Sequence, residues 1–274
     1  MHADWLIPDW PAPANVRAVF TTRSGGLSAR PWDSMNLGDH VGDAPSSVDA
    51  NRAELQRLMQ TRPVFMQQVH GAEVLTLHAA TENGLTADAC ITTQRQLACT
   101  IMVADCLPVL LTDRDGTVVA AAHAGWRGLV GVADVGYKGV LEAVLTAFEG
   151  VFKATAQSIQ AQLAPKIIAW LGPCIGPSAF EVGADVKATF EAGQADAGRF
   201  LVPTGHGKYM ADLPGLARHR LQALGIQQVY GNDGSAPWCT VSNASRFFSH
   251  RRDAGVNGNG FRTTGRMACC IWRT

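Results

Sequence analysis

The sequence predicts a fold at the border between the α/β and α+β classes, with mixed β-sheets. Three observations support this class. Short apolar runs bounded by Gly, Pro or Asp recur up to residue 123 and are typical of buried strands. After Gly128 the apolar spacing changes to that of helices, which then alternate with strands. The turn 113–116 (DRDG) joins two apolar runs as a hairpin, so antiparallel pairs accompany the alternation.

The first half of the chain is expected to be mostly strands. Residues 23–42, which are polar and rich in Gly, are expected to form a long loop, and loops of this length are commonly functional. A helix is expected over 46–59. Runs 64–69 and 72–77 flank His70-Gly71 and are interpreted as the arms of a strand pair. The expected strands are 16–22, 64–69, 72–77, 89–93, 97–104, 109–112 and 117–123.

The second half contains the expected helices. Ile167 to Leu171 is interpreted as a buried strand that breaks at Gly172-Pro173, and short strands are expected at 229–230 and 267–272. Further helices are expected over 155–163, 181–192 and 212–224. One helix face is marked by Val132, Val135, Val140, Leu141, Val144, Leu145 and Phe148.

The composition excludes several classes of partner. The chain has 274 residues, of which 47% are apolar and 17% charged, enough for one large domain or two small ones. Its 23 basic and 23 acidic residues balance, so we expect no nucleic-acid or membrane partner. The first residues have no basic start and no long apolar run, and 97–111 is interrupted by Asp105 and Pro108. We therefore expect neither a signal peptide nor a spanning helix, and a cytoplasmic protein.

Three side chains that metals prefer follow apolar runs in the same manner. Cys106 lies in Ala-Asp-Cys-Leu-Pro, His123 in His-Ala-Gly-Trp-Arg-Gly and His70 in Gln-Gln-Val-His-Gly. Two imidazoles and a thiolate suit zinc, and three protein ligands leave a position for water or substrate, as in catalytic zinc sites. The gaps of 36 and 17 residues match no short zinc motif, so the spacing alone also allows coincidence. All thiols are interpreted as reduced, and a set of five cysteines as small buried side chains: Cys90, Cys99, Cys239, Cys269 and Cys270.

Arginines near these motifs are candidates for binding an anion. Arg127 follows a Gly turn that opens a helix, Arg23 precedes a Gly pair, and Arg251 lies in the run Phe-Phe-Ser-His-Arg-Arg-Asp. Arg127 is equally compatible with an ordinary tight turn, and the run that contains Arg251 is more often a structural, salt-bridged turn. Because no GxGxxG and no GxxxxGK[ST] occurs, the Rossmann and P-loop classes are excluded.

Five separated motifs resemble those of the YfiH family, proteins catalogued as laccase-domain or polyphenol oxidase proteins and as purine nucleoside phosphorylases. The similarity extends from about residue 15 to the C-terminus and includes the early Met-Asn-Leu-Gly-Asp-His-Val-Gly at 35–42. The five motifs are QQVHG at 67–71, ADCLPV at 104–109, AHAGWRG at 122–128, GPCIG at 172–176 with FEV at 180–182, and SHRRD at 249–253 with Gly265-Arg266.

The resemblance implies a single domain over 1–274, a layered sandwich of mixed sheets flanked by helices, similar to the catalytic domain of cytotoxic necrotizing factor. It implies zinc held by His70, Cys106 and His123. It also implies phosphorolysis of adenosine, inosine, guanosine and methylthioadenosine, with deamination of adenosine. For this chemistry we expect Cys106, His123, His70 and Asp105 to be catalytic, and Arg23, Arg127 and Arg251 to bind phosphate.

Rival functions remain open. A copper oxidase is disfavoured because no two of the eight histidines are two residues apart, whereas laccase-type clusters use His-x-His pairs. A metal-free hydrolase would use Cys106 activated by His123. The chain is also compatible with a non-catalytic nucleotide-binding protein and with a peptidoglycan-precursor editing factor. Asp105 either orients a ligand or moves a proton, or it only caps its turn.

Overall fold

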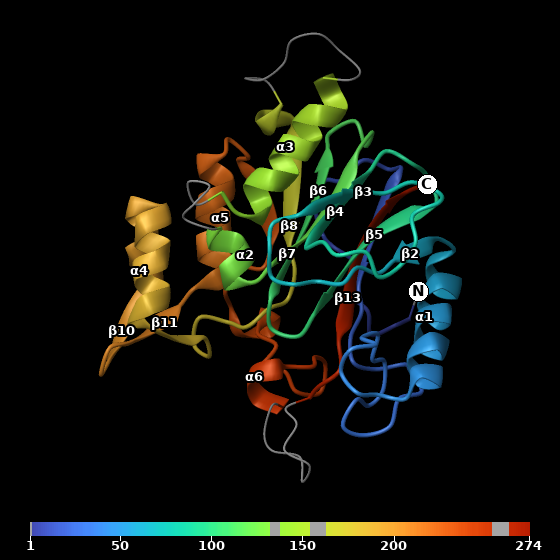
Figure 1. Cartoon of the computed structure of the whole chain (residues 1–274), viewed down its shortest axis with the longest axis horizontal. Coiled ribbons are helices and arrows are strands. Elements are labelled where there is room, and N and C mark those ends of the chain that lie inside the picture. Colours follow the sequence, from blue (N-terminus) through green and yellow to red (C-terminus); the bar gives the residue numbers. More distant parts are fainter. Residues whose placement is uncertain (1, 132–137, 154–162, 254–262) are drawn as a thin grey trace.

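Two β-sheets lie face to face at the centre of the protein (Figure 1). The structure is a computed structural model that describes residues 2–131, 138–153, 163–253 and 263–274. Both sheets contain parallel and antiparallel pairs, so the prediction of mixed sheets is confirmed. The four-stranded sheet has the order β1 (Val16–Phe20), β13 (Met267–Arg273), β5 (Leu97–Val103) and β2 (Arg62–Val64). The six-stranded sheet has the order β12 (Gln228–Gly231), β8 (Ile167–Leu171), β6 (Leu107–Asp113), β7 (Val119–Ala124), β4 (Ala89–Thr92) and β3 (Val74–Thr76).

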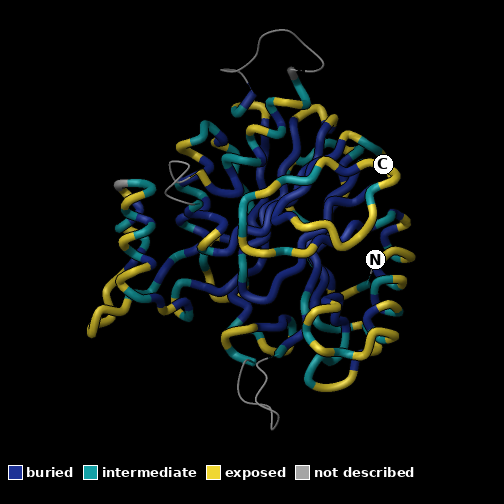
Figure 2. The backbone as a smooth tube through the Cα atoms, in the orientation of Figure 1, coloured by how far each residue is buried: buried dark blue, intermediate teal, exposed yellow. Residues whose placement is uncertain are grey.

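Side chains alternate between the two faces of each strand, as the pleat of a sheet requires. On β13, Cys269 and Ile271 pack between the two sheets, whereas Cys270 and Trp272 point to the opposite face. Both faces are covered, so the central strands β5, β6 and β7 are buried along their whole length and are mostly apolar, as the buried backbone at the centre of Figure 2 shows. The result is a core in three layers, one between the sheets and one outside each sheet.

Helices cover the outer faces, which completes a layered sandwich flanked by helices (Figure 1). Helix α1 (Pro45–Met59) packs Leu55 and Met59 on the four-stranded sheet. The six-stranded sheet is covered by α2 (Trp126–Val130), α3 (Val140–Lys153) and α5 (Leu213–Ala223), of which α3 buries Val140, Val144 and Phe148. The predicted helices 46–59 and 212–224 are therefore confirmed to within a few residues.

A third, three-stranded sheet was not predicted from the sequence. Its order is β10 (Leu201–Gly205), β11 (Lys208–Ala211) and β9 (Glu181–Gly183), and with α4 (Ala184–Gly193) it extends from one side of the molecule in Figure 1. The helix predicted over 181–192 is wrong in its first three residues, which form β9. The remaining short helices are η2 (Ala164–Lys166), η3 (Ala195–Phe200), η4 (Ala236–Trp238) and α6 (His250–Asp253).

The hairpin prediction is confirmed, but the strand pair around His70 is wrong. Strands β6 and β7 pair in antiparallel fashion around the turn at residues 113–116. By contrast, β2 ends at Val64 and pairs with β5, whereas β3 begins at Val74 and pairs with β4. The chain between them passes from one sheet to the other, so the two predicted arms never meet.

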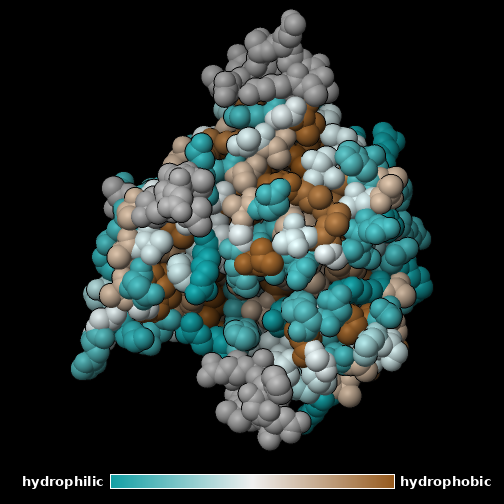
Figure 3. Space-filling view, in the orientation of Figure 1, coloured by the Kyte–Doolittle hydropathy of each residue, from teal (hydrophilic) through white to brown (hydrophobic). Residues whose placement is uncertain are grey.

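Part of the predicted helical pattern cannot be compared. Val132, Val135 and most of the helix expected over 155–163 lie outside the described residues. Among the described helices, none has the length and apolar character needed to cross a membrane. On the face shown in Figure 3, hydrophilic side chains separate the hydrophobic patches from one another.

Candidate metal centre and cavity

Two crossings between the sheets carry His70 and Cys106. His70 lies between β2 and β3, and Cys106 lies between β5 and β6. Each crossing contains a residue in the left-handed backbone region, His70 itself with φ 62° and Asp105 with φ 92°. Non-glycine residues rarely adopt this conformation, and such residues concentrate at functional sites. The crossings therefore turn sharply where the candidate ligands lie.

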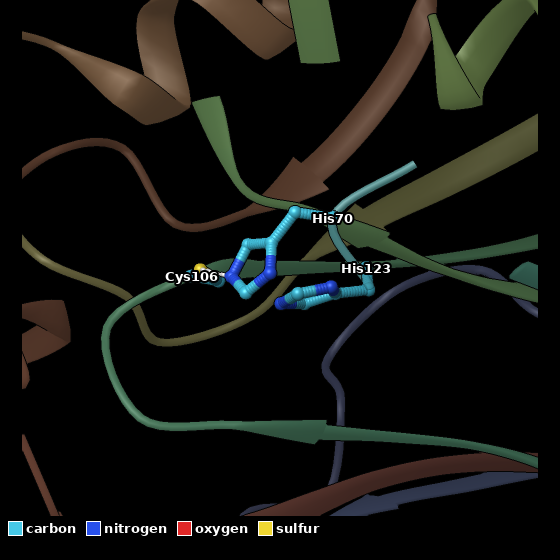
Figure 4. Close-up of side chains that lie close together, drawn as sticks. All are labelled: His70, Cys106 and His123. Carbon is cyan, nitrogen blue, oxygen red and sulfur yellow. Dashed lines mark hydrogen bonds between the residues drawn. The ribbon is translucent and has the colours of Figure 1, made fainter. Parts of the chain in front are cut away.

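His123 completes the cluster from the end of β7. Its side chain lies on the same face of β7 as those of Val119 and Ala121, which pack between the two sheets. In Figure 4 the rings of His70 and His123 lie beside the sulfur of Cys106. Their potential ligand atoms all lie within 4.8 Å of one another, and Cys106 Sγ is 3.7 Å from His70 Nε2. The structure thus brings together the three residues that the sequence singled out.

Gly125 makes room for this cluster. A Cβ atom at this position would lie 3.0 Å from both Cys106 Sγ and the ring of His70. Contacts that short force neighbouring atoms to move, so a larger residue would displace two of the three candidate ligands. The Gly in the turn after His123 is therefore explained by the site as well as by the turn.

Asp88 holds two of the three side chains in place. Its carboxylate is fully buried, and Oδ1 lies 2.8 Å from Nδ1 of His123. The same carboxylate accepts hydrogen bonds from the backbone N–H groups of Val69, His70 and Gly71, at 3.1, 2.9 and 2.7 Å. With Nδ1 of His123 bonded to Asp88, Nε2 is the nitrogen left for a metal, as in the carboxylate–histidine arrangements of metal sites.

Gln68 fixes the same crossing on its other side. Its amide nitrogen donates to the carbonyl oxygen of Met102 at 2.8 Å, and its amide oxygen accepts from the N–H of Met102 at 2.7 Å. This side chain therefore pairs with the end of β5 as a strand would. Together, Gln68 and Asp88 anchor the residues on both sides of Val69.

The charges of Cys106 and His123 depend on each other. Burial acts to raise the pKa of the Cys106 thiol, but the charges and hydrogen bonds of His123 and His70 together outweigh burial and lower this pKa to about 6. Burial likewise opposes protonation of His123, but Cys106 and Asp88 raise the pKa of His123 to about 9. Without a metal the two residues therefore form a thiolate–imidazolium pair at neutral pH. A thiolate is also the form of cysteine that binds a metal.

The cluster lies in the wall of a cavity of about 300 Å³. A cavity of this size is at the lower end of the range typical of small-molecule sites. Its apolar lining includes Trp126, Phe180 and Ile175, and polar groups are distributed around it. The polar residues in the wall are His40, Gln68, His70, Asp105, Cys106, His123, His250, Arg251 and Arg266.

Only one of the three predicted phosphate-binding arginines lines this cavity. Arg251 does so, whereas Arg23 donates to the carbonyl oxygens of Asp33 and Ala244 elsewhere. Arg127 is exposed, with its guanidinium 4.4 Å from the ring centre of Trp126. The structure thus does not bring Arg23 and Arg127 together with Arg251.

The carboxylate of Asp105, next to Cys106 in the sequence, accepts two hydrogen bonds from distant parts of the chain. One carboxylate oxygen accepts from the hydroxyl of Thr240 at 2.5 Å and the other from the backbone N–H of Arg251 at 2.6 Å. With both oxygens occupied, Asp105 fixes the start of α6 and hence the position of Arg251. Its carboxylate thus bonds to the backbone of α6 and to Thr240, both distant in the sequence from the turn that contains Asp105.

Sequence reasoning did not single out Asp88, His40 or Arg266 as site residues. Asp88 offered one signal, since it is a lone acidic residue in the run Ala-Asp-Ala-Cys-Ile that opens β4. An acidic residue in such an apolar run is expected to be buried, and a buried carboxylate needs a charged or hydrogen-bonding partner. Arg266 lies just before β13, and burial lowers the pKa of its guanidinium, partly offset by Cys106 and Asp105.

We expect Asp88→Asn to weaken metal binding by about 10- to 100-fold, the usual effect of removing a hydrogen-bonded carboxylate behind a ligating histidine. An amide presents N–H groups toward at least one of the backbone N–H donors, so some loss of stability should accompany it. Competition with a chromophoric chelator measures the affinity. Glu82→Gln, at an exposed position, is the matched control, and equal affinities in the two variants would exclude the role of Asp88.

Sequence comparisons place these features in a known group of proteins. Residues 17–274 match the family model described as multi-copper polyphenol oxidoreductase laccase. A purine nucleoside phosphorylase of Pseudomonas aeruginosa is 45% identical over 270 residues, covering 98% of both chains. The purine nucleoside phosphorylase YfiH of Escherichia coli is 43% identical, covering 97% of this chain and 98% of its own.

Solved structures show the same fold. A Neisseria meningitidis protein of 39% identity superimposes with a TM-score of 0.83, covering 98% of this chain and 99% of its own. A Bacillus licheniformis hypothetical protein YfiH of 27% identity gives a TM-score of 0.79, covering 94% of this chain and 93% of its own. With a family model and relatives that span nearly its whole length, the chain belongs to the YfiH family of laccase-like proteins.

Proposed function

We propose that the protein is a zinc-dependent purine nucleoside phosphorylase that also deaminates adenosine. Its substrates are adenosine, inosine, guanosine and methylthioadenosine together with phosphate. The observation that supports this most is a His–Cys–His cluster open to a cavity with arginines in its wall, in a chain 43–45% identical to proteins named purine nucleoside phosphorylases. A cluster that can bind a metal and arginines that can bind an anion, both in the wall of one cavity, suit a reaction between a nucleoside and phosphate.

The donor set fits zinc. Two imidazole nitrogens and a thiolate are ligands that zinc accepts in tetrahedral sites, and a fourth position stays open for water or substrate. Three properties of the cluster support this fit: the close approach of the ligand atoms, the low pKa of Cys106 and the hydrogen bond between His123 and Asp88. When bound, zinc supplies Lewis-acid chemistry and activates water for deamination.

The residues of the chain have separate tasks in the proposed reaction. Arg251 and Arg266 line the cavity and supply positive charge for the phosphate dianion. Phe180 and Trp126 offer aromatic surfaces in the same wall against which a purine can stack. Asp105 holds Arg251 through the backbone of that residue. Arg23 and Arg127 are left out of the phosphate site because they do not line the cavity.

A copper oxidase, which the description of the family model suggests, is the less suitable candidate. Within the described ranges, one group of His, Cys, Asp and Glu side chains has metal-binding geometry, and it offers three ligands. Multicopper chemistry needs several copper ions, most of them held by histidines. The arrangement therefore favours a single ion.

Three further candidate functions can be distinguished by experiment. A metal-free hydrolase would use the Cys106–His123 ion pair, and it would stay active after chelation. A non-catalytic binding protein would bind nucleosides without converting them. A peptidoglycan-precursor editing factor would act on precursors instead of nucleosides.

The proposal is tested by incubating the purified protein with adenosine and phosphate and following adenine, ribose 1-phosphate and inosine by chromatography. We expect all three products from the wild type and none from Cys106→Ala. Cys269→Ala, which removes a buried thiol from the core between the sheets, should keep its activity. Equal losses in the two variants would show that the thiols act through the fold alone.

We expect the purified protein to contain about one zinc ion per chain and little copper, because its ligands are two imidazoles and one thiolate. Elemental analysis after expression with both metals supplied measures this ratio. Copper in excess of zinc would overturn the metal assignment. Loss of zinc with unchanged activity would favour the metal-free hydrolase.

We expect Arg251→Lys to raise the KM for phosphate by about tenfold or more, because an ammonium group cannot form the paired hydrogen bonds of a guanidinium. Arg127→Lys is the matched control and should change it little, since Arg127 lies outside the cavity. Steady-state rates at varied phosphate and saturating nucleoside give both values. A larger effect at Arg127 would reverse this assignment.

A further inference from the structure

The long segment between β1 and α1 reaches the cavity at His40, and buried asparagines hold it there. Asn36 is fully buried, and its side-chain oxygen accepts from the N–H groups of Gly38 and Arg266 at 3.0 and 2.9 Å. Asn51, buried on α1, donates to the carbonyl oxygen of Asn36 at 2.8 Å. Asn36 therefore joins the segment that carries His40 to the backbone of Arg266, which lies in the proposed phosphate site.

His40 lines the cavity, and one nitrogen of its imidazole has no hydrogen bond among the described residues. Its Nδ1 lies 3.5 Å from Oδ1 of Asp39, whose other oxygen is 3.1 Å from Arg52. Among the described residues no hydrogen bond of Nε2 is found, and the side chain is 54% exposed. The charged groups that face His40 are Asp39, Arg52 and Arg266. Burial and Arg266 lower its pKa more than Asp39 raises it, so the ring is neutral near pH 7.

Most other titratable groups in the wall are already committed. Both carboxylate oxygens of Asp105 are bonded, and the imidazoles of His70 and His123 belong to the metal cluster. His250 is the other imidazole in the wall, on α6 beside Arg251. His40 and His250 are the two imidazoles in the wall that lie outside the metal cluster, so both are compared as proton carriers.

Phosphorolysis requires a proton to change position. An oxygen of hydrogen phosphate forms a bond to the anomeric carbon of the sugar, and the bond from that carbon to the purine nitrogen breaks with its electron pair going to the purine. The purine then needs a proton, and the phosphate has one to give. A neutral base beside the phosphate can accept that proton and pass it to the purine, so the step balances without another reactant.

We propose that His40 is a catalytic residue of phosphorolysis, which takes the proton of hydrogen phosphate and delivers it to the departing purine. This inference rests on the proposed function. The geometry supports His40 because this residue lines the cavity, and because Gly38, two residues before it, is joined to the backbone of Arg266 through the side chain of Asn36.

The test compares His40→Gln and His40→Ala with His250→Gln and with the exposed, remote control His78→Gln. We expect both His40 variants to lose about 100-fold or more in kcat for phosphorolysis of inosine, the usual scale of acid–base catalysis. The zinc content and the Kd for inosine without phosphate, measured by calorimetry, should stay within about threefold. Imidazole added to His40→Ala should restore part of the rate.

Each other outcome overturns the inference. Rates unchanged in His40→Gln, or a loss only in His250→Gln, would exclude His40. Parallel losses of zinc, inosine binding and rate would show that His40 supports the structure alone. A folded His40→Ala variant that imidazole does not restore would assign the loss to positioning. If the wild type itself forms no ribose 1-phosphate, the proposed function fails first, and that result is distinct from all of these.

Discussion

The buried carboxylate of Asp88 is the interaction on which the candidate site depends. It joins the crossing at 69–71 to the end of β7 by accepting three backbone N–H groups and the ring of His123. A buried charge is costly unless it is paired and hydrogen-bonded. Burial here acts to raise the pKa of Asp88, but its hydrogen bonds and His123 outweigh burial and lower it, so the group remains ionised. One side chain thus fixes the positions and the charge of its neighbours.

The sandwich explains why the chemistry lies in crossings. Strand backbones form their hydrogen bonds within the sheets, and most strand side chains on both faces are apolar, with His123 at the end of β7 as an exception. Polar side chains therefore gather where the chain leaves one sheet for the other, as at His70 and Cys106. The rigid sheets on each side hold these short segments, an arrangement that loops on a stable scaffold commonly use.

The sequence predicted the mixed sheets, the hairpin, helices α1 and α5, and the three side chains of the cluster, because apolar periodicity and short motifs are local signals. It did not predict β9–β11, since strands of three to five residues that are partly exposed carry little periodicity. Nor could it show that Arg23 and Arg127 lie apart from Arg251. The order of the strands and contacts between distant residues, such as the hydrogen bond from the backbone of Arg251 to Asp105, decide which arginines line the cavity. The roles of Asp88, Asn36 and Arg266 likewise depend on contacts between residues far apart in the chain.

The separation of His70, Cys106 and His123 along the chain has a consequence for folding. The three side chains meet only after both sheets have formed and stacked, and closing such long loops is entropically costly. The unfolded chain therefore has no comparable binding site, and an ion held here selects the native state. By mass action, an ion at 100 times its Kd would add about 2.7 kcal/mol to the free energy of unfolding. The metal site would then also stabilise the packing of the two sheets against each other.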